Sequence, residues 1–200
     1  MPASLPRLII ASSNPGKLRE LERLLGDFAT EIVSQSALGI EGAPETAATF
    51  EGNALLKARH AARLGQGAAL ADDSGLEVDA LGGRPGVYSA RYAGENATDA
   101  DNNARLVGEL RQVREPRRAR YRCVIAFVRS ADDPDPVLAE GSWEGSLVLE
   151  PKGSGGFGYD PYFVPSGGEL TAAELPLETK NRISHRALAL NALLKRLRRA

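Results

Sequence analysis

Cysteine and histidine are scarce in this sequence of 200 residues. It contains one cysteine, Cys123, and two histidines, His60 and His185. A single cysteine excludes an intramolecular disulfide and a zinc site built from several thiolates, and two histidines argue against a histidine-rich metal site. Cys123 lies in a largely apolar run at 121–127, so we expect a small buried hydrophobic residue rather than a nucleophile.

Long apolar segments and a large net charge are missing as well. No stretch approaches the ~18 apolar residues that can span a membrane, and the first residues lack the charged and then apolar pattern of a signal peptide. The formal charge of −1 argues against a protein that coats nucleic acid. We therefore expect a cytoplasmic protein whose partners include neither a membrane nor a nucleic acid.

The rest of the composition is that of an ordinary globular protein. Apolar residues make up 42% of the chain and charged residues 26%, enough for one large domain or two packed lobes. Hydrophobic periodicity and turn residues predict strands at 5–11, 31–35, 68–71, 76–81, 120–129 and 137–149, and helices at 17–25, 49–64, 98–111 and 184–198. Interleaved strands and helices favour an α/β fold, and the two consecutive late strands imply some antiparallel pairing.

An apolar run that ends in two adjacent carboxylates is the most informative segment. Residues 68–71 are followed by Asp72 and Asp73, which we call the acid pair, and then by Ser74 and a glycine. Open α/β sheets bind ligands at the carboxyl ends of their strands, and carboxylate oxygens are the ligands that Mg²⁺ prefers. An acidic turn between two strands is the alternative, because Asp, Ser and Gly all favour turns.

The loop that joins the first predicted strand and helix is a second candidate. It reads Ser12-Ser13-Asn14-Pro15-Gly16-Lys17. Backbone N–H groups at a helix start bind phosphate well, and the lysine adds a formal charge. The spacing is not that of a Walker A motif. A capped helix start with a solvated lysine explains the loop equally well.

Lys57 occupies the middle of an apolar stripe on the predicted helix at 49–64, with Asn53 at its edge. The stripe comprises Phe50, Ala54, Ala61 and Leu64. A lysine in this position usually extends its ammonium group to water. We favour a desolvated cation beside carboxylates or a polyphosphate, which would keep the lysine charged.

The glycine-rich segment at 153–161 matches G-x-G-x-x-G, but no helix follows it, so the dinucleotide-binding context is missing. Its Phe157, Tyr159 and Asp160 suit stacking on a base and accepting hydrogen bonds from it. A hairpin whose aromatic rings pack inward is the alternative. Further on, His185 and Arg186 fall in the first turn of a predicted helix, where the dipole disfavours cations; this weakly indicates a functional role.

In this order, the segments resemble the non-canonical purine nucleoside triphosphate pyrophosphatases, the inosine/xanthosine triphosphate pyrophosphatase family. The similarity runs nearly end to end. Gly52 departs from the pattern, since such proteins often carry an acidic residue there. The matching blocks are SNPGK (13–17), TFEGNALLKA (49–58), ADDSGL (71–76), PGVYSARY (85–92), GFGYDP (156–161) and SHR (184–186).

The resemblance implies an elongated α/β subunit with a mixed β-sheet flanked by helices. Residues 1–200 would form one domain of two lobes with a central nucleotide cleft, and the subunit would form a homodimer. The implied reaction hydrolyses ITP, dITP or XTP to the monophosphate and pyrophosphate, which removes deaminated purines from the nucleotide pool. Mg²⁺ would assist the attack of water on the α-phosphorus.

The resemblance also implies roles for individual residues. Asp73 would accept a proton from the attacking water and, with Glu45, bind the metal, while Lys17 and Lys57 would assist catalysis. The expected substrate-binding residues on the phosphate side are Ser12, Ser13, Asn14, Pro15, Gly16, Lys17, Asn53, Lys57 and Ser74. Those expected around the base and sugar are Phe157, Gly158, Tyr159, Asp160, Lys180, His185 and Arg186.

Three other functions remain open from the sequence. A metal phosphatase with an aspartyl nucleophile would need Asp-x-Asp after the strand, which the acid pair does not provide, and it would release phosphate. A pyrophosphatase for modified pyrimidine nucleotides would differ only in its base preference. A non-catalytic nucleotide sensor would keep the pocket without the chemistry, and the acid pair with Lys17 and Lys57 argues against it.

Overall fold

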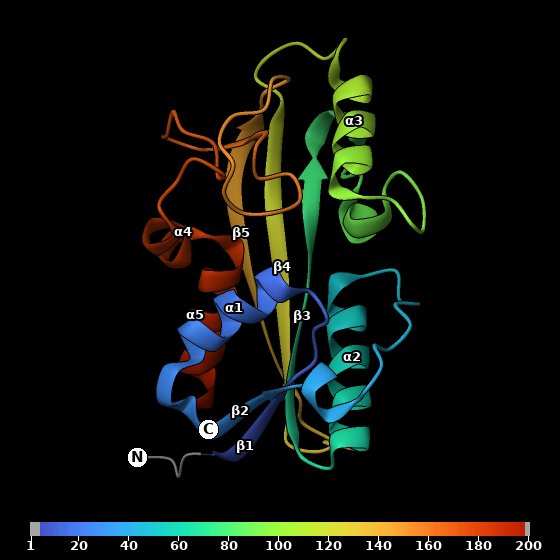
Figure 1. The fold of residues 1–200 in the computed structure, drawn as a ribbon, viewed down its shortest axis with the longest axis vertical. Coiled ribbons are helices and arrows are strands. Elements are labelled where there is room, and N and C mark those ends of the chain that lie inside the picture. The colour runs from blue at the N-terminus through green and yellow to red at the C-terminus, as the bar shows by residue number, and fades with distance from the viewer. Residues whose placement is uncertain (1–4, 199–200) are drawn as a thin grey trace. The chain divides into compact units, whose positions relative to one another are not determined.

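The computed structural model describes residues 5–198, which divide into two compact units (Figure 1). Unit 1 comprises Met1–Asp73, Cys123–Gly141 and Arg186–Ala200, and unit 2 comprises Ser74–Arg122 and Ser142–His185. In the part of the chain that the structure describes, no helix has both the length and the apolar character needed to cross a membrane.

Six strands form one sheet in the order β2-β1-β3-β4-β5-β6. Strand β1 pairs in parallel with β2 and with β3, whereas β5 and β6 pair antiparallel, so the predicted mixed sheet is confirmed. The strands are β1 (Leu5–Ile10), β2 (Ala29–Ser34), β3 (Ala68–Val78), β4 (Arg118–Val128), β5 (Val137–Leu147) and β6 (Phe163–Pro165). The helices are α1 (Pro15–Leu25), α2 (Phe50–Gly65), α3 (Asp99–Leu110), α4 (Leu177–Ile183) and α5 (His185–Leu197).

Helices cover both faces of the strands in unit 1. Leu8 and Ile10 of β1 pack with apolar residues of α1 and α5 in one core cluster. Ile9 alternates with them and therefore faces the other way, where a Cβ at Gly65 of α2 would lie 2.3 Å from its Cδ1. Figure 1 accordingly shows α1 and α5 on one side of these strands and α2 on the other.

The acid pair lies inside a strand, neither at the strand end where it was predicted nor in the turn that was the alternative. Strand β3 runs without interruption from Ala68 to Val78. Side chains alternate between the two faces of a strand, so Asp72 and Asp73 point in opposite directions and each meets its own cationic partners. Paired in this way, two buried carboxylates are compatible with a continuous strand.

Unit 2 has its own core, which gathers Tyr121, Trp143 and Phe163 with aliphatic residues of β3 and α3. Helix α3 begins after Thr98, whose side chain forms the predicted cap in a reciprocal capping box with Asp101. Strand β6 and helix α4 were not predicted. Three and seven residues, respectively, are too few to show a hydrophobic period.

Candidate functional site

In unit 1, a largely buried lysine joins two carboxylates. Lys57 Nζ lies 2.7 Å from Asp73 Oδ1 and 2.8 Å from Glu45 Oε1. The lysine side chain is only 12% exposed, so the prediction of a desolvated cation beside carboxylates is confirmed. Asn53, which is fully buried, donates from Nδ2 to Asp73 Oδ2 at 3.3 Å. Helix α2 thus presents an ammonium and an amide donor to the same carboxylate.

Asp72 meets a different set of cations on the other face of β3. Its Oδ2 lies 3.2 Å from Lys17 Nζ and 3.1 Å from Arg186 Nη2. Arg186 also pairs with Glu20 of α1 and is 1% exposed. Arg186 was predicted to bind the base. In the structure it is held by Asp72 and Glu20, which both belong to unit 1, so its role at the base stays a prediction.

These contacts give the two aspartates different acidities. Burial raises the pKa of Asp72, but Lys17 and Arg186 outweigh it and hold that pKa well below its usual range. Burial also raises the pKa of Asp73, and here Lys57 and Lys17 offset the effect only in part, so the net shift is upward. Asp73 is therefore the member of the acid pair that accepts a proton more readily.

Lys57 stays charged despite its burial. Burial lowers its pKa, but Asp73, Asp72 and Glu45 together raise it above the usual value. Lys17 acts electrostatically on both members of the acid pair, and so does Lys57. Both lysines, although separate in sequence, therefore act on the same two residues of one strand.

The first loop forms the capped helix start that was one of its two predicted readings, but without a solvated lysine. Helix α1 begins at Pro15, two residues earlier than predicted, because Asn14 Oδ1 accepts from the N–H groups of Gly16 and Lys17 at 2.8 and 3.1 Å. The helix start is thus capped, yet the lysine is bound to Asp72 rather than solvated. Ser12 is buried and accepts from the N–H of Asn14, whereas Ser13 is exposed. Phosphate binding by this loop stays a prediction.

In unit 2, Asp160 is the centre of a second buried cluster. Its Oδ2 accepts from Lys180 Nζ at 2.6 Å and from the N–H of Phe157 at 2.9 Å, while Oδ1 accepts from the Tyr121 hydroxyl at 3.3 Å. Gly156 has a φ of +74°, and a Cβ there would lie 2.0 Å from Asp160 Oδ2. Only glycine therefore fits this turn.

Aromatic contacts arrange the remaining predicted base-binding residues. The His185 ring stacks on the Tyr121 ring at 4.7 Å with an interplanar angle of 9°, and Lys180 Nζ lies 4.9 Å above the Phe157 ring. Tyr159 is buried and donates to the Ser89 carbonyl at 2.8 Å. The inward packing left open by the sequence thus holds for Tyr159, whereas Phe157 is half-buried.

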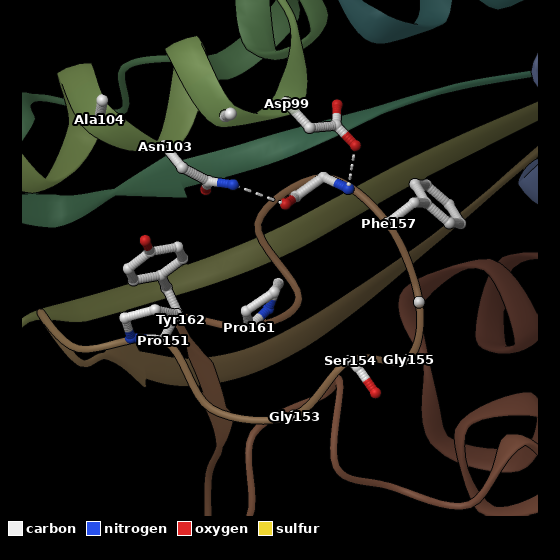
Figure 2. A pocket seen from close by; sticks show the side chains of 13 residues that line it. Asp99, Asn103, Ala104, Pro151, Gly153, Ser154, Gly155, Phe157, Pro161 and Tyr162 are labelled. Carbon is white, nitrogen blue, oxygen red and sulfur yellow. Dashed lines mark hydrogen bonds between the residues drawn. The ribbon is translucent and has the colours of Figure 1, made fainter.

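The N-terminal part of α3 clamps the backbone N–H and C=O of Gly158. Asp99 Oδ2 accepts from the Gly158 N–H at 2.7 Å, and Asn103 Nδ2 donates to the Gly158 carbonyl at 3.0 Å. Figure 2 shows both side chains reaching from α3 to the glycine-rich segment beside a pocket of about 430 Å³. The clamp fixes the backbone between Phe157 and Asp160.

The donor set around Asp73 fits a magnesium ion. The carboxylates of Asp73 and Glu45 already converge on one positive charge, that of Lys57 Nζ. Mg²⁺ is typically held by one or two carboxylates, with substrate phosphates and water completing its shell. Within residues 5–198 no three His, Cys, Asp or Glu side chains gather into a metal site, so a closed protein-only cage is not formed there. Ser74, which follows the acid pair, is half-buried, and its predicted contact with the substrate stays a prediction.

Some residues that build this arrangement had no clear sequence signal. Glu20 lies one helical turn after Lys17, so the two residues are on one face of α1. This spacing was the only sequence signal for Glu20. Tyr121 looked like any strand residue, and Asn103 like any helix residue. Cys123 is buried as predicted, and burial raises its thiol pKa to about 12.

Comparison with known proteins gives close relatives over nearly the whole chain. The family model described as the Ham1 family matches residues 8–196. The dITP/XTP pyrophosphatase of Methylococcus capsulatus is 58% identical over 193 residues, 96% of each chain. The dITP/XTP pyrophosphatase of Escherichia coli is 53% identical and covers 97% of this chain and 99% of its own.

Solved structures give the same result. The HAM1 protein from Coxiella burnetii has a TM-score of 0.88 and 43% identity, and the match covers 98% of this chain and 100% of that one. The nucleoside-triphosphatase / dITP/XTP pyrophosphatase from Mycobacterium abscessus has a TM-score of 0.75 and 46% identity, and the match covers 96% of this chain and 99% of that one. This chain therefore belongs to the Ham1 family.

Proposed function

We propose that the chain hydrolyses ITP, dITP and XTP to the nucleoside monophosphate and pyrophosphate, and so removes deaminated purines from the nucleotide pool. The observation that carries the proposal is the acid pair on β3, with Lys57 on Asp73 and Lys17 on Asp72 at 2.7 and 3.2 Å. The dITP/XTP pyrophosphatase activity named for relatives that are 53–58% identical supports it.

In the proposed reaction Asp73 accepts a proton from the attacking water. Lys57 and Asn53 donate to separate oxygens of its carboxylate and so fix its orientation. Its raised pKa makes it a better base than an ordinary aspartate. Asp72, with its pKa held low, stays ionised and fixes Lys17. The two neighbours thus divide the work of proton transfer and lysine positioning.

The lysines act on the phosphates. Attack of water on the α-phosphorus places negative charge on the non-bridging oxygens and on the departing pyrophosphate. Lys17 and Lys57 neutralise this charge, and their fixed positions avoid reorganisation during the reaction. Asn14 and the rest of the first loop border the phosphates in this proposal.

We further propose that Asp73 and Glu45 hold Mg²⁺. When bound, the ion adds positive charge at the phosphate oxygens and makes coordinated water more acidic. Lys57 would keep its place beside Asp73 and serve the phosphates, while Glu45 turns to the ion. Because Glu45 is the more exposed partner of Lys57, with a side chain 30% exposed, it is the easier of the two carboxylates to reorient.

The base is bound in this proposal by the residues that the resemblance implies. Hypoxanthine and xanthine carry a carbonyl at position 6, where adenine carries an amino group. His185 and backbone N–H groups would donate to that carbonyl, and Arg186 is the further donor expected from the resemblance. Adenine would instead face a donor, at a cost of ~1–3 kcal/mol in a desolvated site. Phe157 provides a ring on which the base can stack.

A substrate panel tests the proposal. ITP, XTP, dITP, ATP and a modified pyrimidine triphosphate are compared by pyrophosphate release, with and without Mg²⁺. We expect kcat/KM for ITP and XTP to exceed that for ATP by at least about tenfold, from the mismatch above. Release of phosphate would favour an aspartyl phosphatase. Preference for the pyrimidine triphosphate would favour a pyrophosphatase for modified pyrimidine nucleotides, and binding without hydrolysis would indicate a nucleotide sensor.

The assembly that we propose is a cytoplasmic homodimer, as the resemblance implies. Sedimentation of the purified chain at several concentrations measures its mass in solution. A single species of twice the chain mass of 21.3 kDa supports the dimer. A species of one chain mass at every concentration would exclude it.

A further inference from the structure

Unit 2 contains a charged hollow that is formed by residues with no part in the proposed reaction. It encloses about 420 Å³ and is lined by Arg84, Arg91, Arg105, Tyr88 and Tyr92, among others. We call it the arginine pocket. Three guanidinium groups line this one hollow.

Two of the guanidinium groups are held in place before any ligand binds. Arg84 Nη2 and Arg105 Nε each lie 3.2 Å from a carboxylate oxygen of Glu109. The buried Tyr92 donates from its hydroxyl to Glu109 at 2.8 Å, and its ring lies 4.5 Å below the Arg105 guanidinium. A site whose side chains are already ordered loses less conformational entropy on binding.

Arg84 and Arg105 carry two positive charges but share one carboxylate, that of Glu109. Glu95 lies 3.8 Å from Arg91, but its side chain is 85% exposed, so solvent weakens that pair. Among residues 5–198, Arg105 Nη2 has no hydrogen-bond acceptor. A hydrogen-bond network that only anchored α3 would not need these additional guanidinium donors.

An exposed aromatic ring stands beside the guanidinium groups. Tyr88 is 56% exposed, and the Arg91 guanidinium lies 5.2 Å from its ring centroid. Aromatic rings paired with arginine stack on nucleobases without regard to their identity. The pocket therefore combines guanidinium donors for an anion with a surface for a planar group.

We propose that the arginine pocket binds the phosphate group of a small molecule, at a site separate from the acid pair. Guanidinium N–H groups bind phosphate oxygens through charge-assisted hydrogen bonds, which favours phosphate over a simple halide. A nucleoside phosphate and inorganic pyrophosphate share this chemistry. Stacking on Tyr88 would favour the nucleotide.

A tryptophan reporter tests this in the full chain. Tyr88→Trp places an indole at the pocket, and the natural tryptophan, Trp143, is buried in the unit 2 core. Emission is followed during separate titrations with inosine monophosphate and pyrophosphate. Arg84→Gln is made in this background, with Arg111→Gln as the matched control, because Arg111 is an exposed arginine at the end of α3 outside the pocket.

We expect a saturable emission change that Arg84→Gln weakens about tenfold and Arg111→Gln leaves within about twofold. Tighter binding of the monophosphate identifies a nucleotide site, and equal binding identifies the phosphate group alone as the determinant. Lys57→Gln should abolish turnover and leave this titration unchanged, so the result stands apart from the proposed function. Because Arg84 is half exposed, Arg84→Gln should stay folded; Arg105→Gln repeats the test from α3.

Two results would overturn the proposal. One is the absence of any saturable change up to about 10 mM of either probe, which is weaker than a specific small-molecule site. The other is a change that persists unaltered in both Arg84→Gln and Arg105→Gln, because the anion would then bind elsewhere.

Discussion

Asp72 and Asp73 are neighbours in the sequence, yet they differ in partners and in acidity. Asp72 is held by Lys17 and Arg186, and its pKa lies well below the usual range, because these cations outweigh the effect of burial. Asp73 is held by Lys57, but burial prevails and raises its pKa. The alternation of side chains along β3 produces this division.

Asp73→Asn tests the proposed base. The amide keeps the shape of the carboxylate but cannot take a proton, so we expect turnover to fall at least ~100-fold. Nucleotide affinity should stay within about tenfold, ~1.4 kcal/mol. Pyrophosphate release and equilibrium binding measure the two effects. Asp79→Asn, at an exposed aspartate of unit 2, is the control; full activity in Asp73→Asn would refute the assignment.

The raised pKa of Asp73 also predicts the acid limb of the rate profile. The base must be ionised, so kcat should fall about tenfold per pH unit once the pH drops below the pKa of Asp73. Because burial moves that pKa upward, the fall should begin above the ordinary value of 3.8. Circular dichroism at each pH checks that the chain is folded. A folded enzyme with an undiminished rate at pH 3.8 would contradict this.

Among the elements, long periodic segments were predictable and β3 was not. The pattern of leucines and the cap residues predicted α1, α2 and α3 to within two residues. Leu64 was expected on the buried stripe of α2, but it lies in the last turn and is exposed. The polar run after Ala71 resembled a turn, because the cations that allow it to continue as a strand come from distant helices.

The contacts of the candidate site depended on tertiary structure in the same way. The stripe on α2 predicted that Lys57 would meet carboxylates or a polyphosphate, and the pair with Asp73 confirms the carboxylate. No local pattern could indicate that Arg186 meets Asp72, 114 residues away. The clamp on Gly158 likewise joins two segments, at 99–103 and 156–161, and neither carries a local pattern that points to the other.

The contact of α3 with Gly158 should affect binding of the base and not the rate of hydrolysis. Asp99→Asn replaces the charged acceptor of the Gly158 N–H with a weaker one, which should loosen Phe157 and Asp160. We expect KM for ITP to rise about threefold to tenfold with kcat nearly unchanged. Asp101→Asn removes a charge from the same helical turn without touching the loop and is the control. If both variants raised KM equally, the effect would come from the start of the helix and not from the contact with Gly158.

At the scale of the whole molecule, each unit carries its own buried polar centre. Unit 1 contains the acid pair with its lysines and Arg186, and unit 2 contains Asp160 with Lys180 and the ring of His185. Buried charges of this kind cost stability when one partner is removed, because the other remains uncompensated. The fold therefore depends on the ionisation of a few carboxylates.

Asp72 should link stability to acid pH. Its pKa is lowered in the folded state, so between that pKa and the ordinary 3.8 the unfolded chain binds more protons. Its contribution is thus complete above pH 3.8 and is lost as the pH falls toward the folded value. Asp72→Asn should cost ~3 kcal/mol at pH 7, and less in acid.

Urea unfolding of both proteins at pH 7 and at about pH 3 measures this difference. Glu95→Gln, at an exposed carboxylate with a weak partner, is the control and should change the unfolding free energy by less than ~0.5 kcal/mol. A gap between wild type and Asp72→Asn that stays constant or widens in acid would contradict the linkage.

The position of the bond that breaks is the central claim, and hydrolysis of ITP in water labelled with oxygen-18 tests it directly. If Asp73 directs water to the α-phosphorus, mass spectrometry should find one labelled oxygen in inosine monophosphate and none in the pyrophosphate. Label in the pyrophosphate, or in released inorganic phosphate, would contradict the account.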